Sequence, residues 1–354
     1  MGKTPSILRI YGDTDFITGL RAIAATMVVI IHTQAFIDFG YVGQAITSAG
    51  KYGVDIFFVI SGFTISKTFK EAKNYRSYLI RRIMRVVPLY WLIISIATML
   101  WLSGLFSLPY WMQEFETQPD LYNFLMHISM LSFLDYRIAT SLLGVEWTIS
   151  IEFFWYVFLP PLICFGKTVS RLIGMIFVIL ILTGILSYIS KELLGTSQPV
   201  KWSPIAHGHL FFIGIISYYL RDRFKSISSQ RPAIWIGVAV ALFALALTIN
   251  FGGRRGVLVL STAILIVYVT PARAEWTTKP LTNRVMLFLG SISYSIYLIH
   301  ILVIHVLDDL SMLPASSIGK FAIVYAITVA LSTITYLLVE KPTNRAGRRL
   351  AQAV

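Results

Sequence analysis

An arginine and a histidine share one strongly apolar segment near the start of the chain, Arg21 and His32 in FITGLRAIAATMVVIIHT. Ionisable side chains are costly inside a bilayer and usually face a partner or a cavity there. On an α-helix, eleven residues correspond to a rise of about 16 Å and a rotation of about 20°, so both side chains share one helix face at opposite depths. Histidine changes its charge near neutral pH. The pair therefore indicates a functional face, with His32 as a candidate general base or nucleophile.

Three more ionisable residues lie in other apolar segments: Asp55, Glu152 and His300. If the chain enters its first span from the cytoplasm, these residues and His32 all fall in the outer half of the bilayer. A carboxylate that orients and charges an imidazole makes a general base, so we expect Glu152 or Asp55 to polarise His32. Each also has a structural alternative. A membrane histidine can hydrogen-bond a neighbouring helix, and Asp55 near a helix start favours the helix dipole.

A basic stretch, RSYLIRRIMRVVPLYW at 76–91, places Arg82 and Arg85 three residues apart on one helix face. Arginines in this arrangement can grip phosphates through paired N–H donors. The structural alternative is anchoring on the cytoplasmic side, where lysine and arginine gather without any ligand.

The remaining histidines carry weaker signals. His127 lies in a short segment, 120–135, and we expect it at the membrane interface. His207 and His209 lie near a helix start and could indicate a metal, but no third ligand is nearby, so we predict no metal site.

The composition requires a membrane protein. Of 354 residues, 56% are hydrophobic and 13% are charged, and the mean hydropathy is +0.72, which a soluble domain could not bury. Apolar runs long enough to cross a hydrocarbon layer of roughly 30 Å recur along the chain. We predict an all-α fold, a polytopic membrane helix bundle of about ten transmembrane helices. The predicted spans are 16–37, 51–69, 88–107, 146–165, 169–190, 204–220, 233–250, 255–271, 285–307 and 317–339.

The distribution of basic residues predicts the orientation. The net charge is +13, and most of this charge lies in clusters between apolar runs. These clusters fall on one side if both termini are cytoplasmic and segment 120–135 does not cross but lies in the outer interface or folds back. The pattern speaks against nucleic acid and for membrane lipids or an anionic cytoplasmic ligand. We therefore predict a single membrane domain, 1–354, that ends in a short basic cytoplasmic tail, 341–354.

Several segments, taken together, resemble the acyltransferase-3 family of integral membrane proteins, which O-acylate carbohydrates in bacterial envelopes. The first apolar segment is similar to the family's first helix, which carries Arg or Lys, ten residues and then His. The other matching segments are GVDIFFVISGF, RRIMRVVP, VEWTISIEFFWY, SYSIYLIH and the closing Glu340-Lys341-Pro342.

The resemblance implies a multi-pass protein of the bacterial cytoplasmic (inner) membrane that uses an acyl-CoA donor, usually acetyl-CoA. It implies a glycan or glycolipid acceptor on the far side, His32 as the catalytic histidine, and Arg82 and Arg85 at or near CoA. Some relatives carry an appended esterase-like domain. Because this chain ends soon after its last span, we expect the membrane module alone, with a separate periplasmic partner as one route for acceptor transfer.

The predicted roles of the site residues follow from the two arguments together. The expected catalytic residues are His32, Glu152 and Asp55; the expected donor-binding residues are Arg82, Arg85 and Arg21; and the expected substrate contacts are Trp147, Ser61, Tyr297 and His300. Direct transfer and an acyl-histidine intermediate are both compatible with this set.

Two rival functions remain open. A secondary transporter could use intramembrane His and Glu as a proton relay, but it predicts an internal repeat that the sequence lacks. In a sensor or assembly factor, the same polar groups would join helices without performing chemistry.

Overall fold

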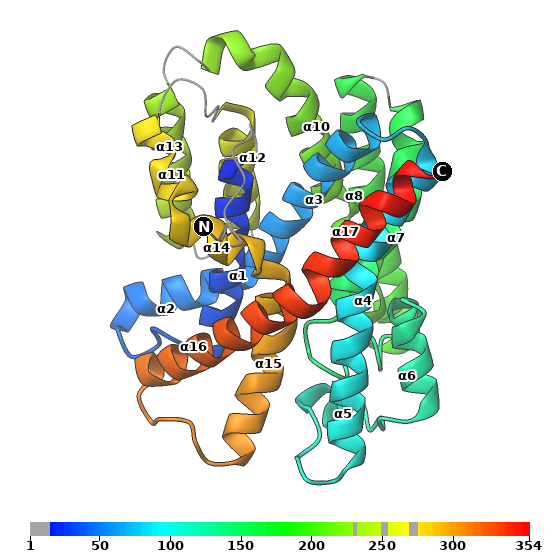
Figure 1. The fold of residues 1–354 in the computed structure, drawn as a ribbon, viewed down its shortest axis with the longest axis vertical. Helices are drawn as coiled ribbons and strands as arrows, with labels where there is room; N and C mark the ends of the chain where they lie inside the picture. The colour runs from blue at the N-terminus through cyan, green and yellow to red at the C-terminus, as the bar shows by residue number, and fades with distance from the viewer. Residues whose placement is uncertain (1–14, 167, 229–231, 249–253, 269–274) are drawn as a thin grey trace, which may run out of the picture.

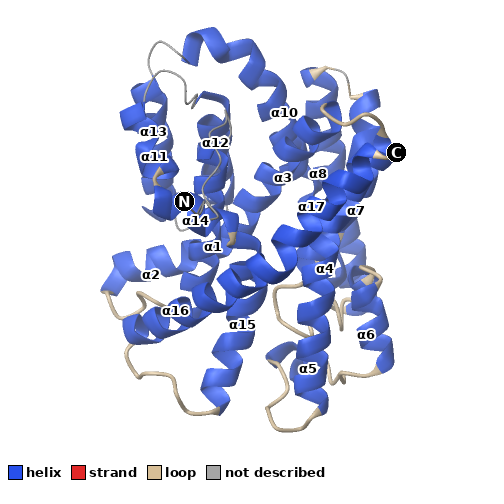
Figure 2. Ribbon diagram, viewed as in Figure 1, coloured by secondary structure: helices blue, strands red, loops and turns tan. Residues whose placement is uncertain are grey.

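Helices make up the regular structure of this chain (Figure 2). The computed structural model describes residues 15–354, apart from 167, 229–231, 249–253 and 269–274, and over these residues no strand occurs, which confirms the all-α class. The elements are α1 (Asp15–Thr33), α2 (Gly40–Ala49), η1 (Gly50–Tyr52), α3 (Gly53–Lys70), α4 (Tyr75–Leu102), α5 (Tyr110–Glu114), α6 (Leu121–Ile128), η2 (Ser132–Leu134), α7 (Trp147–Phe165), α8 (Val169–Leu194), α9 (Gln198–Lys201), α10 (Pro204–Ser228), α11 (Pro232–Thr248), α12 (Arg254–Tyr268), α13 (Glu275–Thr282), α14 (Arg284–Ser291), α15 (Ser293–Asp309), α16 (Ser317–Thr335), the π-helical turn η3 (Tyr336–Glu340) and α17 (Lys341–Gln352).

The helices form a polytopic membrane bundle, as predicted. Within the described residues, five helices are long and apolar enough to cross a bilayer: α1, α4, α7, α8 and the continuous run from α16 to α17. The predicted span 285–307 is divided into α14 and α15, which meet at a bend of 68° and together make a sixth candidate. Helices α3, α10, α11 and α12 occupy the other predicted spans. The number of about ten crossings stays a prediction.

Helix α4 begins earlier than the sequence predicts. The expected third span starts at 88, whereas α4 starts at Tyr75, where the side chain of Asn74 accepts a hydrogen bond from the Ser77 N–H and caps the helix. Pro88 lies inside this helix. The basic stretch is thus the beginning of a membrane helix, and its arginines are carried into the bundle instead of staying in a loop.

Segment 120–135 does not cross the membrane. Its helix, α6, has eight residues, and a helix of that size is about 12 Å long, well short of the hydrocarbon layer. Helix α6 packs on α4, and η2 packs on α7. His127, expected at the interface, is instead fully buried, because the segment folds against the bundle.

Close contacts between glycines and backbone bring α3 to its neighbours. A Cβ on Gly62 would overlap the carbonyl oxygen of Phe211 in α10, and one on Gly214 would overlap the carbonyl of Val59 in α3. Small residues at such crossings let helix backbones approach in a membrane. Since α3 also packs against α1 and α7, it forms one wall of the central site.

The segments predicted outside and the C-terminus, predicted inside, lie toward different ends of the bundle, and which end is cytoplasmic stays a prediction. Figure 1 shows α5, α6 and the loop between α15 and α16 at one end, while the C-terminus lies toward the other. There Asn74 Nδ2 donates a hydrogen bond of 3.0 Å to the Val354 carbonyl, so the chain end lies beside the turn between α3 and α4. The predicted tail, 341–354, is mostly the helix α17, packed on α4. Residues 1–14, which include the predicted cytoplasmic N-terminus, lie outside the described residues.

Candidate active site

A cavity with about 600 Å³ of empty space, its open mouth included, lies between α1, α3, α4, α7 and α15. Residues far apart in the sequence meet at its wall because each of these helices contributes at least one polar side chain to it. The residues singled out from the sequence that line it are Arg21, Ser61, Arg82, Arg85, Glu152 and Tyr297.

The cavity is rich in positive charge. The Arg82 side chain is buried, donates a hydrogen bond of 2.7 Å to Thr68 Oγ1, and lies 4.9 Å from the centroid of the Tyr156 ring. Among the described residues, neither Arg21 nor Arg85 has a hydrogen-bond partner. Three guanidinium groups therefore face one carboxylate in the lining, which suits an anionic ligand with several oxygen atoms.

Glu152 is the carboxylate of this cavity, and neighbouring hydroxyls hold it in place. Its Oε1 accepts a short hydrogen bond from the Ser61 hydroxyl and one of 2.6 Å from the Tyr156 hydroxyl. Tyr156 follows Glu152 by four residues on α7, so the two side chains share a helix face, whereas Ser61 comes from α3. The arrangement fixes the position of the carboxylate on the wall of the cavity.

His32 and His300 form a pair. His300 Nε2 lies 3.0 Å from His32 Nδ1, and the ring centroids are 5.1 Å apart. His300 is fully buried, whereas the His32 side chain is exposed. Neither lines the arginine cavity, but the ring of Tyr297, which does, lies 6.1 Å from that of His300. The histidine pair is therefore one aromatic layer away from the cavity.

The expected contact between His32 and a carboxylate is absent, since neither Glu152 nor Asp55 hydrogen-bonds His32 in the described part of the chain. Glu152 is held by the hydroxyls described above. Asp55 is paired instead with Arg255, at 2.9 and 2.7 Å, and Arg255 also contacts His207 Nδ1 at 3.2 Å.

Trp147 belongs to the same neighbourhood as His207. Its ring lies 5.0 Å from that of His207 and 6.4 Å from that of Phe58, a residue of the cavity wall. Trp147 thus packs behind the wall and does not line the cavity. Among the described residues, no three His, Cys, Asp or Glu side chains lie close enough together to hold a metal ion.

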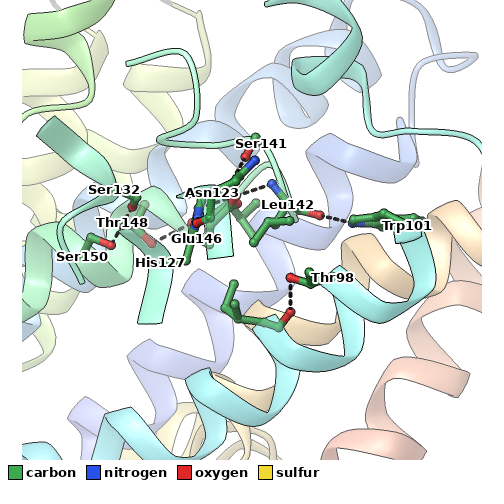
Figure 3. A network of polar contacts seen from close by, with 12 residues as sticks. Thr98, Trp101, Asn123, His127, Ser132, Ser141, Leu142, Glu146, Thr148 and Ser150 are labelled. Carbon is green, nitrogen blue, oxygen red and sulfur yellow. Dashed lines mark hydrogen bonds and ion pairs between the residues drawn. The ribbon is translucent and has the colours of Figure 1, made fainter. Parts of the chain in front are cut away.

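Glu146 and His127 form a buried pair that the sequence did not reveal (Figure 3). His127 Nε2 lies 3.4 Å from Glu146 Oε1, both side chains are fully buried, and the same oxygen accepts a hydrogen bond of 2.7 Å from the Leu142 N–H. Val145, next to Glu146, accepts a hydrogen bond of 2.9 Å from the Tyr297 hydroxyl. Through Glu146 and its neighbour Val145, segment 120–135 thus helps to hold the Tyr297 ring, which lies between the cavity and His300. The signal in the sequence that could have indicated this pair is Glu146 itself, an acidic residue directly before an apolar segment.

Glu340 is a second carboxylate that sequence reasoning left without a role. It is buried, accepts a short hydrogen bond from the Ser295 hydroxyl, and lies within electrostatic range of Arg21 and Arg85. It ends the π-helical turn η3, and such turns are frequent at functional sites. The first residue of the Glu340-Lys341-Pro342 motif therefore lies close to two arginines of the cavity.

Comparison with known proteins agrees with this architecture. The model of the acyltransferase domain family, acyltransferase-3, matches residues 14–337, and the chain belongs to that family. A Staphylococcus aureus (strain COL) protein with the provisional name O-acetyltransferase is 25% identical over 93% of this chain and 57% of its own length. A Bacillus subtilis (strain 168) protein provisionally named as a peptidoglycan O-acetyltransferase is 24% identical over 94% of this chain and 55% of its own length.

This chain thus spans somewhat more than half the length of these two relatives. Nodulation protein 10 of Rhizobium leguminosarum bv. viciae is similar in extent, with 24% identity over 94% of this chain and 95% of its own length. No solved structure matches the chain.

Proposed function

We propose that the protein is an inner-membrane O-acyltransferase, which moves an acyl group, acetyl in the simplest case, from cytoplasmic acyl-CoA to a hydroxyl of an envelope or secreted glycan on the outer side. The observation that carries the proposal is the cavity lined by Arg21, Arg82 and Arg85 and separated from the His32–His300 pair by Tyr297. Family membership and the provisional names of the relatives support the same activity.

The donor would enter from the end of α4 that lies beside the C-terminus. Arg82 and Arg85 occupy successive turns at the start of α4 and would bind the phosphates of CoA through charge-assisted hydrogen bonds. Arg21, one helix over and without a hydrogen-bond partner among the described residues, would hold the next polar part of the donor. The separation of about 16 Å along α1 between Arg21 and His32 suits an extended pantetheine arm.

The chemistry would take place at His32. In direct transfer, the imidazole takes the proton of the acceptor hydroxyl as its oxygen attacks the thioester carbonyl, and the C–S bond then breaks. In the covalent route, the imidazole first forms an N–C bond with the acyl carbon as the C–S bond breaks, and the hydroxyl oxygen then attacks the same carbon as the N–C bond breaks. In both routes the proton of the hydroxyl ends on the sulfur of CoA. The exposed side chain of His32 is open to an acceptor, whereas that of His300 is not.

Acyl-CoA binding to the purified protein in lipid nanodiscs tests the donor site. Arg82→Gln and Arg85→Gln should each weaken binding of acetyl-CoA by about 10-fold to 100-fold, the effect of losing one charge-assisted hydrogen bond of roughly 1.5–3 kcal/mol. Arg349→Gln, at an exposed arginine of α17, is the matched control and should bind like the original protein. Wild-type protein that binds no acyl-CoA would overturn the proposal.

Mass spectrometry of envelope glycans tests the transfer itself. Cells that carry the protein should show acylated glycans, and cells with His32→Ala should not. A secondary transporter would instead move its solute without consuming acyl-CoA, so solute uptake without CoA release would favour that rival.

A further inference from the structure

The hydrogen bonds of His300 determine where the protons of the histidine pair lie. His300 Nδ1 is 3.1 Å from the carbonyl oxygen of Ile296, which can only accept, so this nitrogen carries a proton. A neutral imidazole has one N–H and one acceptor nitrogen. His300 Nε2 is then the acceptor, and the nitrogen that faces it at 3.0 Å, His32 Nδ1, must be the donor. The lone pair of His32 is left on Nε2.

The opposite arrangement requires a charged His300. If His300 carried two protons, its Nε2–H would donate to His32 Nδ1, and neutral His32 would be protonated on Nε2, without a basic nitrogen to react. Full burial makes that charge costly, because an ionised group in an apolar interior needs a charged partner. In the described part of the chain, no carboxylate contacts either ring of the pair.

We propose that His300 is a positioning residue that holds His32 in the tautomer with a bare Nε2. It acts through a neutral ring and thereby fills the place that a buried aspartate takes in a Ser-His-Asp triad. The assignment of protons follows from the hydrogen bonds of the two rings, whereas its consequence for catalysis rests on the proposed function.

The surrounding helix holds His300 firmly enough for this role. The Ile296 carbonyl is four residues back on the same helix, so α15 itself orients the imidazole. One turn before His300, Tyr297 donates to the Val145 carbonyl at 2.9 Å and accepts from the Thr148 hydroxyl at 2.8 Å. These bonds tie α15 to the start of α7. Rotation of α15, which would turn His300 away from His32, would break both of them.

The tautomer decides which atom reacts. With the proton on Nδ1, Nε2 of His32 can take the proton of the acceptor hydroxyl or form the N–C bond to the acyl carbon as the C–S bond breaks. In either case His32 gains positive charge, and the hydrogen bond from its Nδ1–H to His300 Nε2 then becomes charge-assisted and stronger. His300 thus stabilises the imidazolium without touching substrate.

Nitrogen NMR of the protein labelled with 15N-histidine in nanodiscs reads the tautomer directly and needs no activity. His32→Ala identifies the His32 signals. We expect His32 to be protonated on Nδ1 with a bare Nε2. His300→Gln places an acceptor oxygen where His300 Nε2 faces His32 Nδ1, and this variant should preserve the tautomer. His300→Leu removes the acceptor and should give a mixture of tautomers. His305→Leu, one histidine further along α15, is the control and should change nothing at His32.

Kinetics then connects the tautomer with catalysis. His300→Leu should lower kcat by about 100-fold or more, the usual size of a general-base effect, with an unchanged KM for acetyl-CoA, and His300→Gln should recover most of the loss. A His32 signal protonated on Nε2 in the original protein, or one that His300→Leu leaves unchanged, would overturn this proposal even if His32→Ala abolishes transfer. Conversely, if the expected tautomers are observed but the protein has no transferase activity, the assignment of protons to the pair stands and the proposed function is refuted.

Discussion

The buried pair of His127 and Glu146 should contribute measurably to stability, and Glu146→Gln isolates that contribution. His127 Nδ1 lies 2.8 Å from the Asn123 carbonyl and donates to it, which leaves His127 Nε2 facing Glu146 Oε1 at 3.4 Å. Glutamine keeps the volume of the side chain and an oxygen for the Leu142 N–H but removes the charge that faces His127.

The magnitude follows from the complete burial of both side chains. Removing one partner of a buried pair costs about 3–5 kcal/mol, and retention of the Leu142 hydrogen bond places Glu146→Gln near the lower end, about 3 kcal/mol. His127→Leu should cost a similar amount. The double variant should lose about 2 kcal/mol less than the sum of the two, because neither group is then left buried without its partner.

Reversible unfolding in mixed micelles, followed by tryptophan fluorescence, measures these free energies for the four proteins of the cycle. Arg137→Gln, at an exposed side chain between His127 and Glu146 in the sequence, is the control and should change the free energy of unfolding by less than about 0.5 kcal/mol. Strictly additive effects of Glu146→Gln and His127→Leu would refute a stabilising interaction between the two side chains.

Three more predictions concern the elements around the cavity. Ser61→Ala and Tyr156→Phe each remove one hydrogen-bond donor to Glu152 and should lower the turnover of acyl transfer about tenfold, while acetyl-CoA binding changes little. Transfer of radiolabelled acetyl groups measures the turnover, and an unchanged value would show that Glu152 needs neither hydroxyl. Gly62→Ala forces a methyl group into the Phe211 carbonyl and should lower the melting temperature and the yield of folded protein, whereas Gly184→Ala, on α8 with open space around it, should not; equal melting curves would contradict the close crossing of α3 and α10. Asp55→Asn and Arg255→Gln should lower the melting temperature by similar amounts, with the double variant no worse than either single one, and independent effects would mean that their ion pair does not form in the membrane.

Local pattern was sufficient to predict which side chains share a helix face. The spacing of Arg21 and His32 and that of Arg82 and Arg85 follow from the helical period, so each pair was expected on one face, and the three arginines do line one cavity. Composition and the long continuous apolar runs were sufficient for the all-α membrane class, because a run of that length satisfies its own backbone hydrogen bonds in a bilayer as a helix.

The partners of the buried polar groups were decided only by the tertiary structure. His32 meets His300 across 268 residues and Asp55 meets Arg255 across 200, and a helical period says which way a side chain points but not which helix it meets. For this reason Asp55, an expected partner of His32, belongs to a different cluster. His127 was expected at the interface because its segment is too short to cross, and only the packing of that segment against α4 and α7 buries it beside Glu146. The sequence by itself thus determined the chemistry available in the bilayer, and the packing of the helices determined which of these groups meet.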